Sequence, residues 1–452
     1  MNLAHRIISS VESDSPTISV VPGEGRRKKE TFQEQVIEQI IAQMKNDLTP
    51  QKLLETRMQL RLIECHPLYV EPTTSVDTSY RFGWNRGLAM KVETIVRGRW
   101  FKWLNIIHNG ELNSGEALPT CRMDNVAGTN EVQRMLQRCM NHVRSEGERV
   151  DVLIDWIGYS LGISWCKRPT ISERLWNNLY QEFDISLFLL HPSDHLSHFM
   201  AEEGNQSGLN GYYPTPLSIT SFINMILGSD NPHMTVQTVF EPCLGAGAML
   251  LPTNSLAPVG VDLNLLLVKA ASIQAFCYLP PLLYTPTPII GLHYSREEAR
   301  LNKYFEFRTN TRIYCGDSLI GELKAPLNIF QEDSEWIDIY LNPLDLQKRE
   351  VFQYEEEMAK PWSSLSKEMK FKIVVAQARE LGFDCVASNP PFGKLNRYTL
   401  ERIEEIEASN KLFVEQRKKR LALQNIAPHP MVEEIHEDVE IKMNEIGQYQ
   451  LF

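Results

Sequence analysis

The 452-residue sequence contains no closely spaced pair of cysteines. Its eight cysteines are isolated, no C-x-x-C motif occurs, and no cysteine–histidine cluster has the spacing of a zinc site. Several cysteines lie in apolar, strand-like runs, where a free thiol behaves as a small hydrophobic residue. We therefore expect buried free thiols, a reducing cytoplasmic location and no metal site.

A long uninterrupted apolar segment is also missing. The start, MNLAHRIISSVESDSPT, has no apolar core of the length of a signal peptide. The most apolar stretch, LNLLLVKAASIQAFCYL, contains Lys269 and Gln274, which favours a buried helix over a membrane span. The sequence thus predicts a soluble protein that does not partner with a membrane.

Basic residues are not in excess. The formal net charge is −11 at pH 7 and the isoelectric point is about 5.6. Such a chain has no global field that attracts phosphate, although a local basic face is sufficient to bind nucleic acid. The composition therefore weakens a nucleic-acid function without excluding it.

The first half of the chain has a helical pattern. Residues 1–30 are rich in Ser, Pro and Gly and predict a mobile arm. Residues 31–200 predict a helical N-terminal domain, because apolar residues recur at three- and four-residue steps, as in NEVQRMLQRCMNHVRSE. The segment RGRWFKWLNIIH mixes basic and aromatic residues, as base-stacking surfaces do. An amphipathic core helix with a basic outer face is the favoured interpretation.

From residue 205 to residue 400 the pattern changes to alternating strands and helices. Four β-rich runs, TVQTVFEP, PVGVDL, TRIYCGD and FDCVASNPP, are separated by helical stretches. This alternation predicts an α/β fold with a parallel, doubly wound sheet, in which ligands bind beyond the carboxyl ends of the strands. Residues 319–382 predict a helical insertion in this domain, and residues 401–452 predict a charged helical tail.

Three of these runs end in residues suited to a nucleotide. Glu241 ends the first run, and Gly245 and Gly247 follow in FEPCLGAGAML, where glycines permit a tight turn and a close ligand. Asp262 ends the second run at the usual place of a ribose-binding acid. Asp317 ends the third and could accept a hydrogen bond from an adenine amino group. Taken singly, Asp262 is more typical of a strand-end cap and Asp317 of a turn.

The fourth run ends in an unusual string, Asn389, Pro390, Pro391 and Phe392. The amide oxygen of Asn389 and the rigidly held carbonyl of Pro390 offer two acceptors. Two such bonds to an exocyclic amino group help to localise its nitrogen lone pair for attack on a methyl group. Phe392 would stack on the captured base. The string therefore predicts an amine-activating clamp, with a structural turn as the alternative.

The order of these motifs resembles that of the N6-adenine DNA methyltransferases in which the S-adenosylmethionine motifs precede the catalytic one. NGYYPTP, with Tyr213, Thr215 and Pro216, is similar to the leading motif that closes over the methionine end of the cofactor. EPCLGAG is similar to the glycine-rich motif and NPPF to the catalytic motif, with Asp262 and Asp317 as the ribose-binding and adenine-binding acids. The resemblance spans about residues 205–394.

The resemblance implies a Rossmann-like methyltransferase sheet, S-adenosylmethionine as cofactor and transfer of a methyl group to a flipped adenine in DNA. The helical first half is more loosely similar to the domain ahead of the catalytic domain in modification subunits of restriction systems. An RNA base or a protein glutamine remains open as the substrate. A catalytically inactive cofactor-binding module of a replication or defence complex is a further alternative.

The chain departs from the family pattern after the catalytic motif. The family sheet continues there with three more strands, whereas residues 394–452 are rich in charged residues, and ERIEEIEASNKLFVEQRKKRLALQ predicts a helix with no clear strand after it. We therefore expect an incomplete sheet, whose late strands are missing, rebuilt from elsewhere in this chain, or supplied by a partner such as a specificity subunit.

The last residues, IGQYQLF, suggest a second partner. Gln448, Leu451 and Phe452 have the spacing of the short peptide with which many bacterial proteins dock on the sliding clamp of the replication machinery. Such a tether would raise the effective concentration of the enzyme at newly copied DNA. The alternatives are a chance match, or a tail that folds back onto the core.

Overall fold

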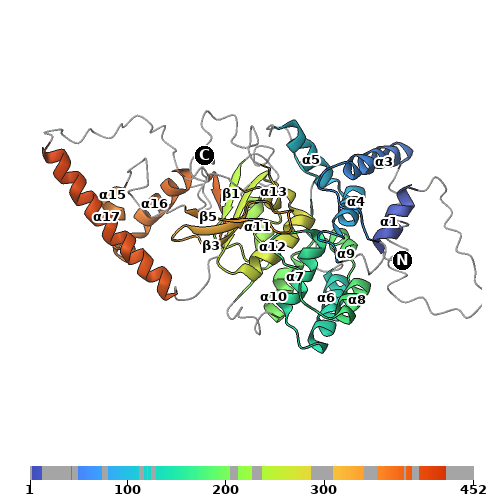
Figure 1. Ribbon diagram of the computed structural model, residues 1–452. Helices are drawn as coiled ribbons and strands as arrows, with labels where there is room; N and C mark the ends of the chain where they lie inside the picture. Colours follow the sequence, from blue (N-terminus) through green and yellow to red (C-terminus); the bar gives the residue numbers. More distant parts are fainter. Residues whose placement is uncertain are drawn as a thin grey trace, which may run out of the picture. The chain divides into compact units, whose positions relative to one another are not determined.

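The computed structural model describes thirteen segments of the chain. They are residues 3–12, 42, 49–73, 80–110, 117–119, 121–123, 129–203, 212–226, 237–286, 309–340, 354–380, 383–388 and 396–423. The chain divides into two compact units (Figure 1). Unit 1 comprises Met1–Pro343 and Val375–Leu395, and unit 2 comprises Leu344–Val374 and Asn396–Phe452.

The described part of the chain has an α/β fold. Its strands are β1 (Thr238–Glu241), β2 (Ala257–Asp262), β3 (Ile313–Asp317), β4 (Glu322–Pro326), β5 (Trp336–Tyr340) and β6 (Cys385–Val386). The helices of the first half are α1 (Leu3–Glu12), α3 (Pro50–Glu64), α4 (Arg86–Val96), α5 (Arg99–Asn109), α6 (Thr129–Ser145), α7 (Val150–Leu161), α8 (Glu173–Glu182), α9 (Ile185–Leu190), α10 (His195–Glu203) and α11 (Leu217–Ile226). Later come α12 (Leu265–Tyr278), α13 (Pro280–Leu283), α15 (Glu355–Met358), α16 (Lys367–Glu380) and α17 (Arg397–Leu423).

The six strands form one mixed sheet with the order β5-β4-β3-β2-β1-β6. The four runs predicted as strands are confirmed as β1, β2, β3 and β6, and these four are parallel. The chain goes from β1 outward through β2 to β3, and then returns to the other side of β1 as β6. The strand order thus reverses between β1 and β6, which is the topological switch point at which open α/β sheets bind ligands.

Two strands lie in the segment 319–382, which the sequence analysis assigned to a helical insertion. β4 and β5 extend the sheet beyond β3 as antiparallel strands. Burial alternates along both, since buried Leu323 precedes exposed Lys324, and exposed Asp338 lies between the partly buried Ile337 and Ile339. This period of two is the pattern of a strand with one covered face. Among the described residues of this segment, the helices are α15, α16 and a short 3-10 helix, Trp362–Ser364.

The helical half and the sheet share one hydrophobic core, so the compact units do not divide near residues 200–205. α1 contributes Leu3, Ala4 and Ile7 to this core, so residues 3–12 are a packed helix within the segment predicted as a mobile arm. α5 illustrates the shared core, because Trp100 and Trp103 are fully buried. Their indole N–H groups donate 2.7 Å hydrogen bonds to the carbonyls of Phe276 and Tyr284 beside the sheet. The basic–aromatic segment is therefore a core helix, as favoured. Arg99, however, is only 1% exposed and does not belong to a basic outer face.

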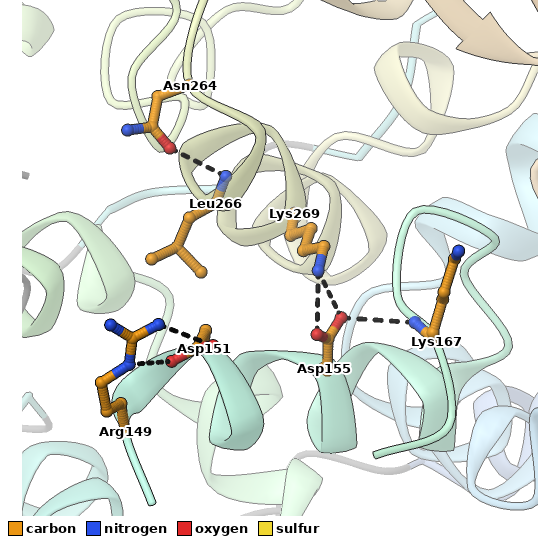
Figure 2. A network of polar contacts seen from close by, with 7 residues as sticks. All are labelled: Arg149, Asp151, Asp155, Lys167, Asn264, Leu266 and Lys269. Atoms are coloured by element: carbon orange, nitrogen blue, oxygen red, sulfur yellow. Dashed lines mark hydrogen bonds and ion pairs between the residues drawn. The ribbon is translucent and has the colours of Figure 1, made fainter. Parts of the chain in front are cut away.

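An ion pair also joins the two halves of unit 1. Lys269 of α12 reaches Asp155 of α7, and its Nζ lies 2.7 Å from Oδ1 and 2.9 Å from Oδ2 (Figure 2). The backbone N–H of Lys167 donates a further hydrogen bond to Asp155, at 3.3 Å. Burial raises the pKa of Asp155, and the ammonium of Lys269 opposes that rise. α12 is otherwise apolar and buried, as its sequence predicted.

Unit 2 has a small core of its own. Met358, Ile373 and Val414 are buried together, from α15, α16 and α17. Arg417 pairs with Glu355, and Lys418 lies 2.7 Å from Glu356, so two ion pairs join α17 to α15. No described helix of either unit has the length and apolarity needed to cross a membrane. The cysteines are free thiols, as expected, and five of them are buried.

Candidate functional site

The acids predicted for ligand binding lie at one edge of the sheet. Glu241, Asp262 and Asp317 are the last residues of β1, β2 and β3, whose parallel pairing brings their carboxyl ends to the same side. β6 ends beside β1 at this edge. The predicted clamp, residues 389–392, lies outside the described residues. The three predicted acids therefore lie at the sheet edge that contains the switch point, and the clamp is the one predicted part of the site that is not described.

A tight turn, residues 242–247, follows β1 and is called the glycine turn below. The backbone N–H of Gly245 donates a 2.7 Å hydrogen bond to Oδ2 of Asp262, and Oδ1 accepts another, 2.8 Å long, from the N–H of Asn264. Gly245 has φ of +57° and Gly247 has φ of +99°, conformations that residues with a Cβ rarely adopt. Asp262 therefore fixes the glycine turn and keeps free acceptor capacity on both oxygens.

Tyr212, rather than Tyr213, contacts the glycine turn. The hydroxyl of Tyr212 accepts a 3.2 Å hydrogen bond from the N–H of Ala246. A Cβ at Gly245 would lie 3.1 Å from that hydroxyl, so the close approach requires glycine. Tyr213 is 74% exposed. The sequence analysis missed Tyr212 because two adjacent tyrosines outside a regular element give no indication of which one faces inward.

Gln274 connects the glycine turn to the helical half. This fully buried side chain donates from Nε2 to Oδ1 of Asp194, at 2.7 Å, and to the carbonyl of Ala246, at 2.8 Å. Its Oε1 accepts a 3.0 Å hydrogen bond from the N–H of Leu196. Asp194 precedes α10 and is separated from Gln274 by 80 positions. Neither residue belongs to a local motif, and the sequence analysis named neither as a site residue.

Side chains just beyond β3 and β6 also bind the glycine turn. The hydroxyl of Ser318 donates a 2.8 Å hydrogen bond to the carbonyl of Pro242. The Cys243 thiol is hydrogen-bonded to the side chain of Ser388, the residue immediately before the predicted clamp. With the bond from Gly245 to Asp262, the turn is thus connected to each of the other three parallel strands.

The ionisable groups around the glycine turn are acids. Glu241 is 3% exposed, and burial raises its pKa well above the usual range, with the carboxylates of Asp262 and Asp194 raising it further. Its Oε2 is buried without a hydrogen-bond partner. Burial also raises the pKa of Asp262 to about 6, against the opposing effect of its two backbone hydrogen bonds. A ligand with hydrogen-bond donors or a positive charge would satisfy these acids.

A cavity of about 600 Å³ lies beside this cluster. α6, the start of α10 and residues 214–218 line it, so it contains Thr215 and Pro216 of the predicted leading motif. Asp194 also lines the cavity. Gly245, Asp262 and Asp317 do not, so the cavity covers only one side of the predicted cofactor site. Because Gln274 bonds both Asp194 and Ala246, the cavity is adjacent to the glycine turn.

Among the described residues, no group of three or more His, Cys, Asp or Glu side chains could hold a metal ion. The predicted clamp-docking residues Gln448, Leu451 and Phe452 lie outside the described part of the chain. No family model, curated protein or solved structure matches the chain significantly. Sequence motifs and geometry therefore carry the functional argument.

Proposed function

We propose that the protein is an S-adenosylmethionine-dependent methyltransferase that modifies the N6 amino group of adenine in DNA. The observation that carries this proposal is the meeting of Glu241, Asp262, Asp317 and the glycine turn at the β1/β6 switch point. A doubly wound sheet binds nucleotide ligands at this position. The spatial order β3-β2-β1-β6 of the parallel strands in the sheet supports a Rossmann-like arrangement.

The described residues fit S-adenosylmethionine. The remaining acceptor positions of Asp262 suit ribose hydroxyls, and Asp317 lies one strand further along the edge for the adenine amino group. The unpartnered Oε2 of Glu241 would gain a donor from the ligand. Thr215 and Pro216 line the cavity, which would receive the methionine end, and Tyr213 near them in sequence is exposed. When bound, the cofactor would supply an electrophilic methyl group.

The catalytic part of the proposal depends on Asn389, Pro390, Pro391 and Phe392. Asn389 and the carbonyl of Pro390 would accept the two amino hydrogens of the target base, while Phe392 stacks on its face. β6 ends three residues before Asn389, and Ser388 is tied to the glycine turn through Cys243. This connection would hold the clamp close to the cofactor-binding turn. The base must leave the DNA stack to enter such a clamp.

The first experiment measures cofactor binding and methyl transfer separately. Calorimetry with the intact chain should show binding of S-adenosylmethionine or S-adenosylhomocysteine. Radiolabelled methyl groups should appear on adenine in DNA and be lost in Asn389→Ala, whose cofactor affinity stays nearly unchanged because the amide contacts the target. Undiminished transfer by that variant would place the clamp elsewhere. Label in RNA or protein, but not DNA, would favour the alternative substrates.

One observation favours a second function, a cofactor-binding module without its own catalysis. Among the described residues, β6 is the edge of the sheet and pairs only with β1. A specificity or other subunit could complete that edge. Under this alternative, calorimetry detects the cofactor, and methyl transfer is absent until the partner is added. Transfer by the purified chain alone excludes it.

A further inference from the structure

The cavity lies between the helical half and the leading motif, so both contribute to its lining. Asp194 and His198 come from the α10 region, and Gln133 and Gln137 come from α6. Two carboxylates, Asp194 and Glu202, line it, and no Arg or Lys does so among the described residues. The lining therefore suits a ligand group that donates hydrogen bonds or carries positive charge.

Asp194 is held rigidly at the inner side of this cavity. Its Oδ1 accepts hydrogen bonds from Nε2 of Gln274, at 2.7 Å, and from the backbone N–H of Ser197, at 3.3 Å. The same Gln274 nitrogen bonds the carbonyl of Ala246, so Asp194 lies one amide group away from the glycine turn. A ligand held on the turn could extend into the cavity past this carboxylate.

Asp194 also lies near the buried acid at the end of β1. Its charge raises the pKa of Glu241, which places the two carboxylates within electrostatic reach of each other. Oε2 of Glu241 has no hydrogen-bond partner although the residue is 3% exposed. His198 is the one basic group that acts on Asp194, and no basic group acts on Glu241 among the described residues. An ammonium group, with three donors, would satisfy both acids.

We propose that Asp194, supplied by the helical half, binds the α-ammonium group of the cofactor together with Glu241, and that the cavity receives the aminocarboxylate end. This inference rests on the proposed function and adds a binding residue from outside the motif-bearing half. The cofactor site then spans both halves of unit 1. The helical half becomes part of the cofactor site as well as of the shared core.

The test compares S-adenosylhomocysteine with its desamino analogue, which keeps the carboxylate and lacks the ammonium. Calorimetry with the full wild-type chain should show that S-adenosylhomocysteine binds roughly tenfold to a hundredfold more tightly than the desamino analogue. This is the range expected for a hydrogen-bonded charge. Asp194→Asn keeps the Oδ1 acceptor for Gln274 and removes the charge. It should lose most of this preference while its affinity for the desamino analogue stays unchanged.

Glu173→Gln is the control, since Glu173 is an exposed acid of the helical half that does not line this cavity. Its preference for the amine should remain that of the wild type. An unchanged preference in Asp194→Asn, with the preference lost in Glu241→Gln, overturns the role of Asp194 and leaves the cofactor site intact. Wild-type protein that binds neither compound overturns the proposed function, and this inference with it.

Discussion

Asp155 and Glu241 are both acids withdrawn from water, and burial raises the pKa of each, but their surroundings differ. Asp155 faces Lys269 and the N–H of Lys167, as Figure 2 shows. Glu241 faces two further carboxylates and has an oxygen without a partner. The first acid is satisfied by the protein itself, whereas the second needs a group from elsewhere.

The difference separates a structural acid from a ligand-binding one. The partly buried ion pair between Asp155 and Lys269 contributes to the packing of α7 against α12. A buried acid without a cation destabilises the fold and is retained where a ligand completes it. Removal of the cation that pairs with Asp155 should therefore lower the stability of the fold. Removal of the Glu241 carboxyl group should instead weaken ligand binding.

The largest effect is expected for Lys269→Met. The substitution leaves Asp155 without its cation in a largely buried position, which costs about 3 kcal/mol of unfolding free energy. Chemical denaturation measures this loss. The double variant Asp155→Asn/Lys269→Met should recover much of it, because no buried charge remains. Equal losses in the single and double variants would mean that packing, rather than charge, sets the cost.

Asp262→Asn should weaken ligand binding, and it also removes one of the two backbone hydrogen bonds that Asp262 accepts. We expect S-adenosylmethionine to bind more weakly by about 1–3 kcal/mol, since the ribose hydroxyls lose a charged acceptor. The pKa of Asp262 is about 6, and hydroxyl donors favour the carboxylate, so wild-type affinity should rise between pH 5 and 7. The variant should lack this rise. Calorimetry across that pH range, at constant ionic strength, distinguishes the two.

Glu241→Gln should raise the unfolding free energy near neutral pH, by at most about 1 kcal/mol. The folded-state pKa of Glu241 lies above its unfolded value, so the folded protein binds the extra proton. Wild-type stability should consequently fall as pH rises above the unfolded pKa of the acid. The Gln variant should show a weaker fall in denaturation curves. A variant that is less stable at every pH would contradict this account.

The smallest effect on the unfolding free energy is expected for Arg149→Ala, which removes the exposed ion pair in Figure 2. Arg149 pairs with Asp151 at 3.4 Å, and both side chains are substantially exposed. Exposed pairs contribute little, so the unfolding free energy should change by less than about 0.5 kcal/mol. Denaturation of this variant beside Lys269→Met compares exposed and buried pairing within the same helix region.

The sequence predicted the parallel strands well because their apolar runs and terminal acids are local signals. β4 and β5 were missed although β5, WIDIY, alternates Ile337, Asp338 and Ile339. The prolines and charges around them obscured this pattern. An antiparallel pair beyond β3 also has no counterpart in the resemblance, which places further strands only after the catalytic motif.

The partners of the site were less predictable than its motifs. Glu241 and the two glycines were found from a contiguous string, whereas Gln274 and Asp194 act through contacts between distant positions. A glutamine in an apolar helix is a usable signal, because a buried amide must find hydrogen bonds. The sequence could not say that its partners would be Asp194 and the glycine turn.

The pairing of β6 with β1 has a consequence for the order of folding. Val239 pairs with Pro258 on one side and with Cys385 on the other. The first neighbour follows soon after β1 during synthesis, and the second emerges only after β3, β4 and β5 have been made. Until then, β1 has an unpaired edge, the kind of surface that invites association between nascent chains. A ribosome-bound chain ending before residue 383 should therefore require chaperones more than the complete protein does.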